Sequence, residues 1–195
     1  MAIGLLCIGL ILMGSLKTQA HYSPLKRIQN LILSKVPLQP DFQDEKFQGK
    51  WFVVGGADNR IPKEGKPAMN RITYELEDDH SFNVTSTWVN DQGCDHWSST
   101  VVPSGQPGQF TMANITSFSG VQNFIMRVVA TDYNQFAIVF YRIVQDGVQS
   151  VATLLGRTTE LNPELRKRFV NFAMTLGFTD ENIFFSDPME KCMDV

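Results

Sequence analysis

Apolar and polar residues alternate along a series of short segments in the middle of the chain. In residues 81–89, the apolar Phe82, Val84 and Trp88 alternate with the polar Asn83 and Thr85, which is the period of a strand with one buried face. Clusters of Asp, Asn, Gly and Pro separate one such segment from the next, as tight turns would. The pattern predicts eight sequential antiparallel strands at residues 50–57, 69–76, 81–89, 94–102, 109–113, 122–130, 135–144 and 149–155.

The segment at residues 135–144 is apolar on both faces and therefore needs cover on both sides. One amphipathic helix can supply that cover: Asn162 caps it, Pro163 opens it and Gly177 ends it, and a short strand is expected at residues 182–185. Its apolar stripe consists of Leu165, Phe169, Phe172 and Leu176. We predict an all-β fold, an eight-stranded antiparallel up-and-down β-barrel with one C-terminal α-helix packed outside, whose interior can hold one small ligand.

The first twenty residues form an apolar run that ends in Thr18-Gln19-Ala20, with small residues where a signal peptidase cuts. The run is short for a membrane span, so residues 1–20 are predicted to be a signal peptide, with an uncleaved anchor as the alternative. Residues 21–40 would then be an N-terminal arm and residues 41–195 the barrel domain. The mature protein is expected to be secreted and extracellular, without membrane insertion.

Composition and charge narrow the classes of partner. The chain has 195 residues, of which 43% are hydrophobic, enough for one domain with a core. Its formal charge of −3 becomes −4 without the leader, and no basic stripe is present to bind nucleic acid. His21, His80 and His96 lack the spacing of metal ligands, so we predict no metal and no cofactor.

Two cysteines remain once Cys7 leaves with the leader. Cys94 and Cys192 are therefore predicted to form a disulfide, which closes a loop worth roughly 4 to 5 kcal/mol in the chain-entropy model. Asn83 and Asn114 each begin an Asn-X-Thr triplet and are predicted glycosylation sites.

Three short motifs in order resemble the signature motifs of the lipocalin family. They are Gly49-Lys50-Trp51, Thr131-Asp132-Tyr133 and Gly156-Arg157. The resemblance covers the mature chain and is greatest to secreted lipocalins that bind siderophores, occur in the epididymis or isomerise prostaglandins. It implies structural roles for Gly49, Thr131, Asp132 and Tyr133, with Trp51 plugging the closed end of the barrel and Arg157 lying over it. A guanidinium stacked on an indole is physically sensible there.

The strand phases then predict which side chains face the cavity. The candidate ligand-binding residues are Asn70, Ile72, Ser86, Trp88, Trp97, Ser99, Phe124, Met126, Tyr141 and Ile143. With Val53, Tyr74, Val139, Val151 and Thr153 they make a wall that is apolar and aromatic, with a few hydroxyl or amide groups and no charge. Such a pocket favours a small hydrophobic molecule such as a retinoid, fatty acid, steroid or odorant, so we predict a monomeric carrier without enzymatic activity.

Three alternatives stay open. Siderophore-binding lipocalins hold an anionic ferric complex between three cationic side chains, but the matching positions here are Ser99, Ile143 and Val151. Prostaglandin D synthase-like isomerisation needs a cavity thiolate, and the matching position is Asn70. The third alternative is that a cell-surface receptor is the partner and the cavity is incidental.

Overall fold

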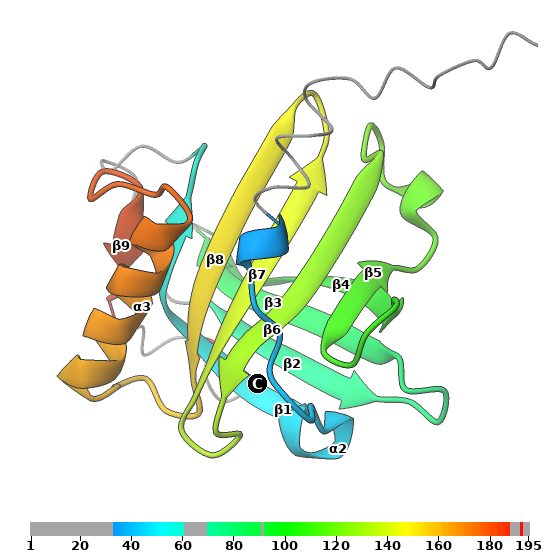
Figure 1. The fold of residues 1–195 in the computed structure, drawn as a ribbon. Helices are drawn as coiled ribbons and strands as arrows, with labels where there is room; N and C mark the ends of the chain where they lie inside the picture. Colours follow the sequence, from blue (N-terminus) through cyan, green and yellow to red (C-terminus); the bar gives the residue numbers. More distant parts are fainter. Residues whose placement is uncertain (1–32, 61–69, 91, 188–191, 193–195) are drawn as a thin grey trace, which may run out of the picture.

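The predicted barrel is confirmed in a computed structural model of the chain, which describes residues 33–60, 70–90, 92–187 and 192. The described part comprises one continuous sheet closed on itself, with helical segments outside it (Figure 1). The predicted signal peptide, residues 1–20, and part of the arm, residues 21–32, lie outside the described residues. The strands are β1 (Gly49–Asp58), β2 (Arg71–Leu76), β3 (Phe82–Asn90), β4 (Gly93–Pro103), β5 (Gln109–Met112), β6 (Asn123–Thr131), β7 (Phe136–Val144), β8 (Val148–Gly156) and β9 (Ile183–Phe185). The helices are α2 (Asp44–Phe47), the 3-10 turn η1 (Ile115–Ser117) and α3 (Pro163–Thr175), and residues 33–35 are helical as well.

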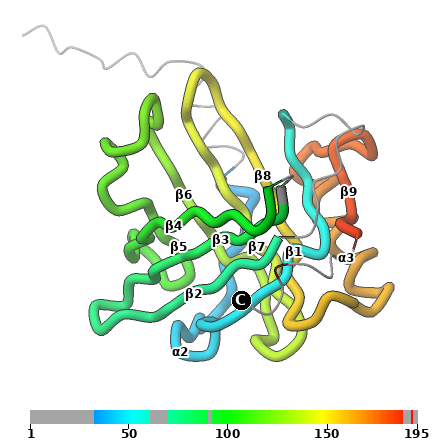
Figure 2. Tube along the Cα trace, turned by 180° about the vertical axis from the view of Figure 1, so that it is seen from behind, coloured from blue at the N-terminus to red at the C-terminus, as the bar shows by residue number. Residues whose placement is uncertain are grey.

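Strand β1 closes the barrel because it pairs with different strands along its length. Its first half pairs with β2, from Gly49 to Phe52, and its last half pairs with β9, from Gly55 to Ala57. The register along β8 shifts between Val53 and Gly55, at the change of partner. The rear view shows β9 beside the end of β1, next to α3 (Figure 2).

The Gly55-Gly56 pair in β1 makes room for two aromatic rings of β9. A Cβ at Gly55 would lie 2.7 Å from Cδ1 of Phe185, and one at Gly56 would lie 2.5 Å from Cζ of Phe184. Carbon atoms in contact need more than 3 Å, so side chains at these positions would displace the rings. The two glycines thus allow β9 to pair with β1 beyond Phe52, where the pairing of β1 with β2 stops.

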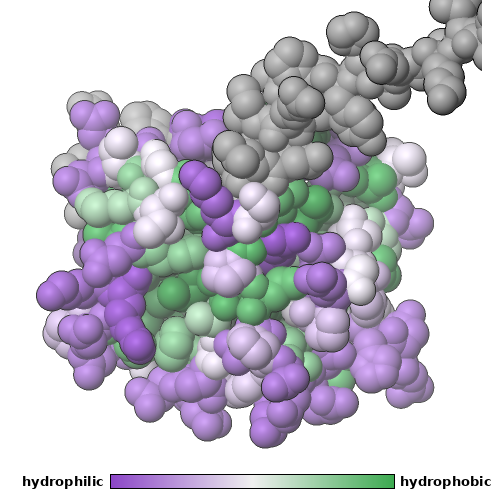
Figure 3. Space-filling model, in the orientation of Figure 1, coloured by the Kyte–Doolittle hydropathy of each residue, from purple (hydrophilic) through white to green (hydrophobic). Residues whose placement is uncertain are grey.

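Helix α3 covers the outer wall of the barrel, as predicted. Phe169 and Ala173 are fully buried in an outer hydrophobic cluster with Phe140 of β7 and Leu154 of β8. The other face of β7 points inward, where Val139 belongs to the inner cluster, so both faces of this strand are covered. On the outer surface of the barrel, Figure 3 shows hydrophobic side chains gathered in the middle of the view, over β6 to β8.

Local signals in the sequence set both ends of α3. The Asn162 side chain accepts a hydrogen bond from the amide of Glu164 at 2.8 Å, and Pro163 occupies the first turn. At the other end Gly177 has φ of +92°, and the amide of Phe178 donates to the carbonyl of Ala173. This is the left-handed glycine ending that the sequence predicts.

Two further segments are tied to the barrel wall. Arg127 of β6 donates from Nη1 to the carbonyls of Leu33 and Val36, at 2.7 and 2.9 Å, and thereby holds the described part of the arm. At the other terminus the predicted disulfide between Cys94 and Cys192 is confirmed, with a Cα–Cα distance of 5.6 Å. It links the chain end to the start of β4.

In the ranges that the structure describes, no helix has the length and apolar character needed to cross a membrane.

Candidate functional site

One end of the barrel is filled by Trp51, which is completely buried. Its indole Nε1 donates to the carbonyl of Phe47 at 2.8 Å, and the guanidinium carbon of Arg157 lies 3.7 Å from the ring centroid. Arg157 also donates to the carbonyls of Tyr133 and Lys50, at 3.0 and 2.8 Å. Burial lowers the pKa of Arg157 from its ordinary value, because desolvation disfavours the charged form. Trp51 and Arg157 therefore form a seal.

The Thr131-Asp132-Tyr133 motif forms the tight turn between β6 and β7 at the same end. Oδ1 of Asp132 accepts hydrogen bonds from the amides of Gln135 and Phe136, at 2.8 and 3.0 Å. The Thr131 hydroxyl donates to the carbonyl of Phe136 at 2.7 Å and accepts from the amide of Tyr133 at 2.8 Å. Gly49, with φ of +98°, passes beside Arg157, where a Cβ would be 3.3 Å from Nη1. These residues position the sealed end and do not line the cavity.

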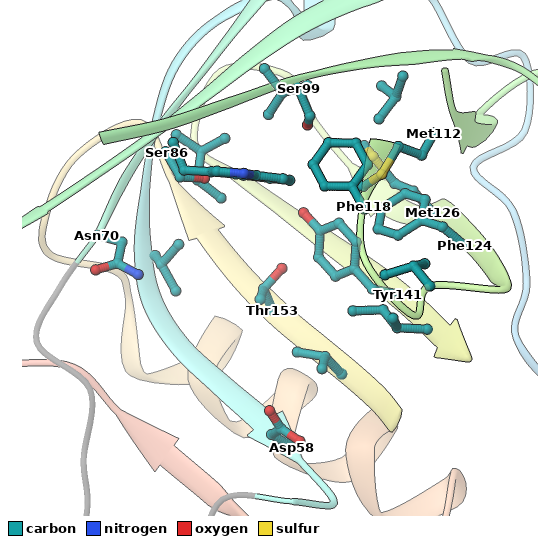
Figure 4. A pocket seen from close by; sticks show the side chains of 18 of the residues that line it. Asp58, Asn70, Ser86, Ser99, Met112, Phe118, Phe124, Met126, Tyr141 and Thr153 are labelled. Carbon is teal, nitrogen blue, oxygen red and sulfur yellow. The ribbon is translucent and has the colours of Figure 1, made fainter. Parts of the chain in front are cut away.

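A cavity of about 450 Å³ lies in the barrel above this seal (Figure 4). Side chains of β1 to β8 and of the segment that contains β9 line it, most of them apolar or aromatic. Figure 4 shows Phe118, Phe124, Tyr141 and two methionines grouped on one side, with Asn70 and Asp58 apart from them. The lining residues are Val53, Asp58, Asn70, Ile72, Tyr74, Val84, Ser86, Trp97, Ser99, Val101, Met112, Phe118, Val121, Phe124, Met126, Tyr141, Ile143, Gln145, Val151, Thr153, Phe184 and Ser186.

The structure brings nine of the ten candidate ligand-binding residues to this cavity; their contact with a ligand stays a prediction. Trp88 is the exception, because it is half-buried on β3 and is not among the described lining residues. It shares a strand face with Ser86, but it lies two residues nearer the open end, opposite Asp95. Alternation gives the face of a strand, and it does not give the height in the barrel at which the cavity ends.

Two tyrosines place a hydrogen-bonded pair of hydroxyl groups on the cavity wall. The hydroxyls of Tyr74 and Tyr141 lie 3.0 Å apart and hydrogen-bond to each other. Burial raises the pKa of both above the ordinary value, because desolvation disfavours the phenolate. Thr153 donates to the carbonyl of Val139 at 3.3 Å. The pair is uncharged at neutral pH.

The expectation of an uncharged lining is wrong, because Asp58 lines the cavity and is only 4% exposed. The predicted strand ends at residue 57, which assigns Asp58 to a loop. In the structure β1 includes Asp58 as its last residue. Asp58 pairs with Val151 and Gly56 pairs with Thr153, so Asp58 shares the inward face. Sequence reasoning also missed Ser186 after β9, whose buried hydroxyl has no hydrogen-bond partner among the described residues.

The remaining candidates lie outside the cavity. Asn83 donates from Nδ2 to Oε1 of Glu77 at 2.5 Å, and Asn114 is exposed with φ of +49° before η1; their glycosylation stays a prediction. His80 lies 3.0 Å from Asp44 on the surface, and burial is the main cause that raises the pKa of Asp44. Over the described stretches of chain, no group of three or more His, Cys, Asp or Glu side chains could hold a metal ion.

Comparison with known proteins agrees with this architecture. The sequence model described as "Lipocalin / cytosolic fatty-acid binding protein family" matches residues 48–190. Neutrophil gelatinase-associated lipocalin of Rattus norvegicus is 47% identical over the whole of both chains. Prostaglandin-H2 D-isomerase of Ovis aries is 32% identical, over 96% of this chain and 94% of its own. The solution structure of lipocalin 12 from rat epididymis superposes with a TM-score of 0.74 at 32% identity, over 82% of this chain and 93% of that one. A barrel that is sealed at one end below an apolar cavity, together with this breadth of sequence similarity, leads to one conclusion: the chain belongs to the lipocalin family.

Proposed function

We propose that the mature chain is a secreted, monomeric carrier that binds one small hydrophobic molecule in the barrel cavity. The observation that supports this proposal is the lining itself, which surrounds a space of about 450 Å³ with mostly apolar and aromatic walls. Binding removes apolar surface of ligand and wall from water, which contributes about 2.5 kcal/mol for every roughly 100 Å² buried. No chemical step is required, because burial holds the ligand during transport.

A few polar groups on the wall can orient the ligand. Asn70, directly before β2, presents an amide to the cavity. Ser86 of β3 and Ser99 of β4 each present a hydroxyl. Pockets for hydrophobic molecules commonly combine an apolar wall with a small number of such groups. Their separate positions around the wall favour a ligand with one or two polar atoms.

Siderophore binding receives less support, although a neutrophil gelatinase-associated lipocalin is 47% identical to this chain. Ser99, Ile143 and Val151, where that mode needs cationic side chains, all line the cavity. No lysine or arginine is present among the described lining residues. An anionic iron complex would lose its hydration without gaining a compensating charge, which is costly.

An isomerase activity also receives less support. The position that would need a nucleophilic thiolate is occupied by Asn70, whose side chain is an amide. Both cysteines in the described part of the chain are joined in the disulfide. Nucleophilic catalysis by cysteine needs a free thiolate in the cavity, so we assign no catalytic role.

A binding titration tests the carrier proposal. We expect saturable quenching of tryptophan fluorescence by retinol and saturable binding of the uncharged probe N-phenyl-1-naphthylamine. Phe124→Asp places a charge on the buried cavity wall and should abolish binding of both. Asn123→Asp adds the same charge on the exposed neighbour and should leave binding unchanged. Equal loss in both variants, or no binding by the unmodified protein, would refute the proposal.

A further inference from the structure

Asp58 is the one charged side chain among the described residues that line the cavity. It is the last residue of β1 and is 4% exposed. Opposite it on β8 lies Val151, and two residues earlier Gly56 lies opposite Thr153. Val151 and Thr153 both line the cavity, so the pairing explains why Asp58 reaches the same space from the open end. Figure 4 shows Asp58 extending from the end of β1.

The carboxylate of Asp58 is held by two neutral donors. Oδ1 accepts from the backbone amide of Arg60 and Oδ2 accepts from Nε2 of Gln149, both at 2.8 Å. The guanidinium of Arg60 donates from Nη2 to the carbonyl of Gln145 instead. Within the described ranges, no lysine or arginine nitrogen lies within 4 Å of this carboxylate. One donor on each oxygen fixes the group in place and leaves further acceptor capacity on both oxygens.

A buried carboxylate that has no cationic partner among the described residues changes which ligands the cavity can take. Removing an ion from water is costly unless an opposite charge compensates it. A ligand ammonium at the open end would supply that charge and a further hydrogen-bond donor. A ligand carboxylate at the same place would put two negative charges together in a medium of low dielectric constant.

We propose that Asp58 selects the ligand by charge: the cavity takes an apolar molecule that carries a protonated amine, and it discriminates against carboxylates such as fatty acids. The inference rests on the proposed carrier function and narrows its ligand class. The amine meets Asp58 at the open end, while the hydrocarbon part lies against the aromatic and methionine wall around Phe124 and Met126. The Tyr74 and Tyr141 hydroxyls on that wall are neutral and hydrogen-bond to each other, so they offer no charge to compete with Asp58 for the ammonium group.

Three ligands with the same twelve-carbon chain separate charge from apolar burial. Dodecylamine, dodecanol and dodecanoate are titrated at neutral pH, below their micellar concentrations, against purified mature protein loaded with N-phenyl-1-naphthylamine. Displacement of the probe gives each dissociation constant. We expect dodecylamine to bind roughly 10-fold or more tightly than dodecanoate, with dodecanol between them, because one contact changes from attraction to repulsion.

Asp58→Asn keeps the size of the side chain and removes its charge. We expect dodecylamine to lose about 10-fold in affinity and dodecanoate to gain, with dodecanol and the probe within about twofold of the unmodified protein. Asp146→Asn is the matched control, since it removes an exposed carboxylate in the β7–β8 turn at the same end of the barrel. It should leave the order of the three ligands unchanged.

The outcomes distinguish the two proposals. Failure of both dodecanol and the probe to bind the unmodified protein would refute the carrier function itself. Binding of dodecanol without a preference for the amine, or a preference that persists in Asp58→Asn, would overturn the charge selection and leave the carrier function standing. The ranking in the unmodified protein decides the question alone if Asp58→Asn does not fold.

Discussion

Replacing Arg157 with alanine is expected to lower the free energy of unfolding by about 3 kcal/mol. The guanidinium lies 3.7 Å from the centroid of Trp51 and donates to the carbonyls of Tyr133, Lys50 and Gln48 at 2.8 to 3.0 Å. The stacking contact contributes about 1 kcal/mol. A hydrogen bond from a charged donor is worth about 1.5 to 3 kcal/mol when buried. The half-exposed carbonyls here can bond to water in the variant, so we assign each of the three roughly 0.7 kcal/mol.

Urea unfolding at neutral pH measures the loss, and thermal unfolding should show a midpoint lower by roughly 6 to 12 °C. Arg157→Lys keeps the charge but not the planar fork of donors, so it should recover less than half of the stability. Affinity for an uncharged probe should not change in either variant, because the seal lies at the other end of the barrel from the cavity mouth. A loss below about 1 kcal/mol in Arg157→Ala would refute the view that this contact network closes the barrel.

Three further predictions concern the wall and the sheet. Trp97 lines the cavity and is 42% exposed, so Trp97→Phe should remove most of the ligand-induced fluorescence change, and quenching that stays at full amplitude would contradict this. Gly56→Ala should destabilise the fold by about 1 to 3 kcal/mol through its clash with Phe184, and the double variant with Phe184→Leu should be less than additive in urea unfolding. Burial raises the pKa of Tyr74 and Tyr141 above 10.0, so the unfolded chain ionises first and stability falls as pH rises past that value. Tyr141→Phe should weaken this alkaline loss, measured as the urea midpoint between pH 8 and pH 11.

The strands and the outer helix could be predicted because each meets two different environments. Phe82 and Val84 point into the inner cluster while Asn83 between them points out, so the alternation in the sequence is the alternation of the structure. The helix is marked at both ends by residues that satisfy its terminal backbone groups, Asn162 and Gly177. Such local signals do not depend on the rest of the fold.

The missing parts of the site depend on contacts between distant segments. Ser186 and Phe184 reach the cavity only because β9 pairs with β1, and a three-residue strand has no periodicity that shows where it docks. Asp58 lies one residue beyond the end of the predicted strand, whereas β1 includes it. A polar residue at a strand end has the same sequence pattern in a loop and on a wall, so only the pairing with β8 distinguishes them.

The arrangement of the two hydrophobic clusters separates stability from ligand choice. Phe47, Trp51 and Phe82 are fully buried at the sealed end, and Phe140 and Phe169 are fully buried outside the barrel. Asp58 belongs to neither cluster, whereas Tyr74 and Met126 line the cavity and also belong to the inner cluster. Changing Asp58 therefore leaves the packing of the sealed end and of the outer layer intact. The charge at the mouth can therefore change, as in Asp58→Asn, with most of the free energy of folding preserved, and the selectivity of this barrel is set independently of its fold.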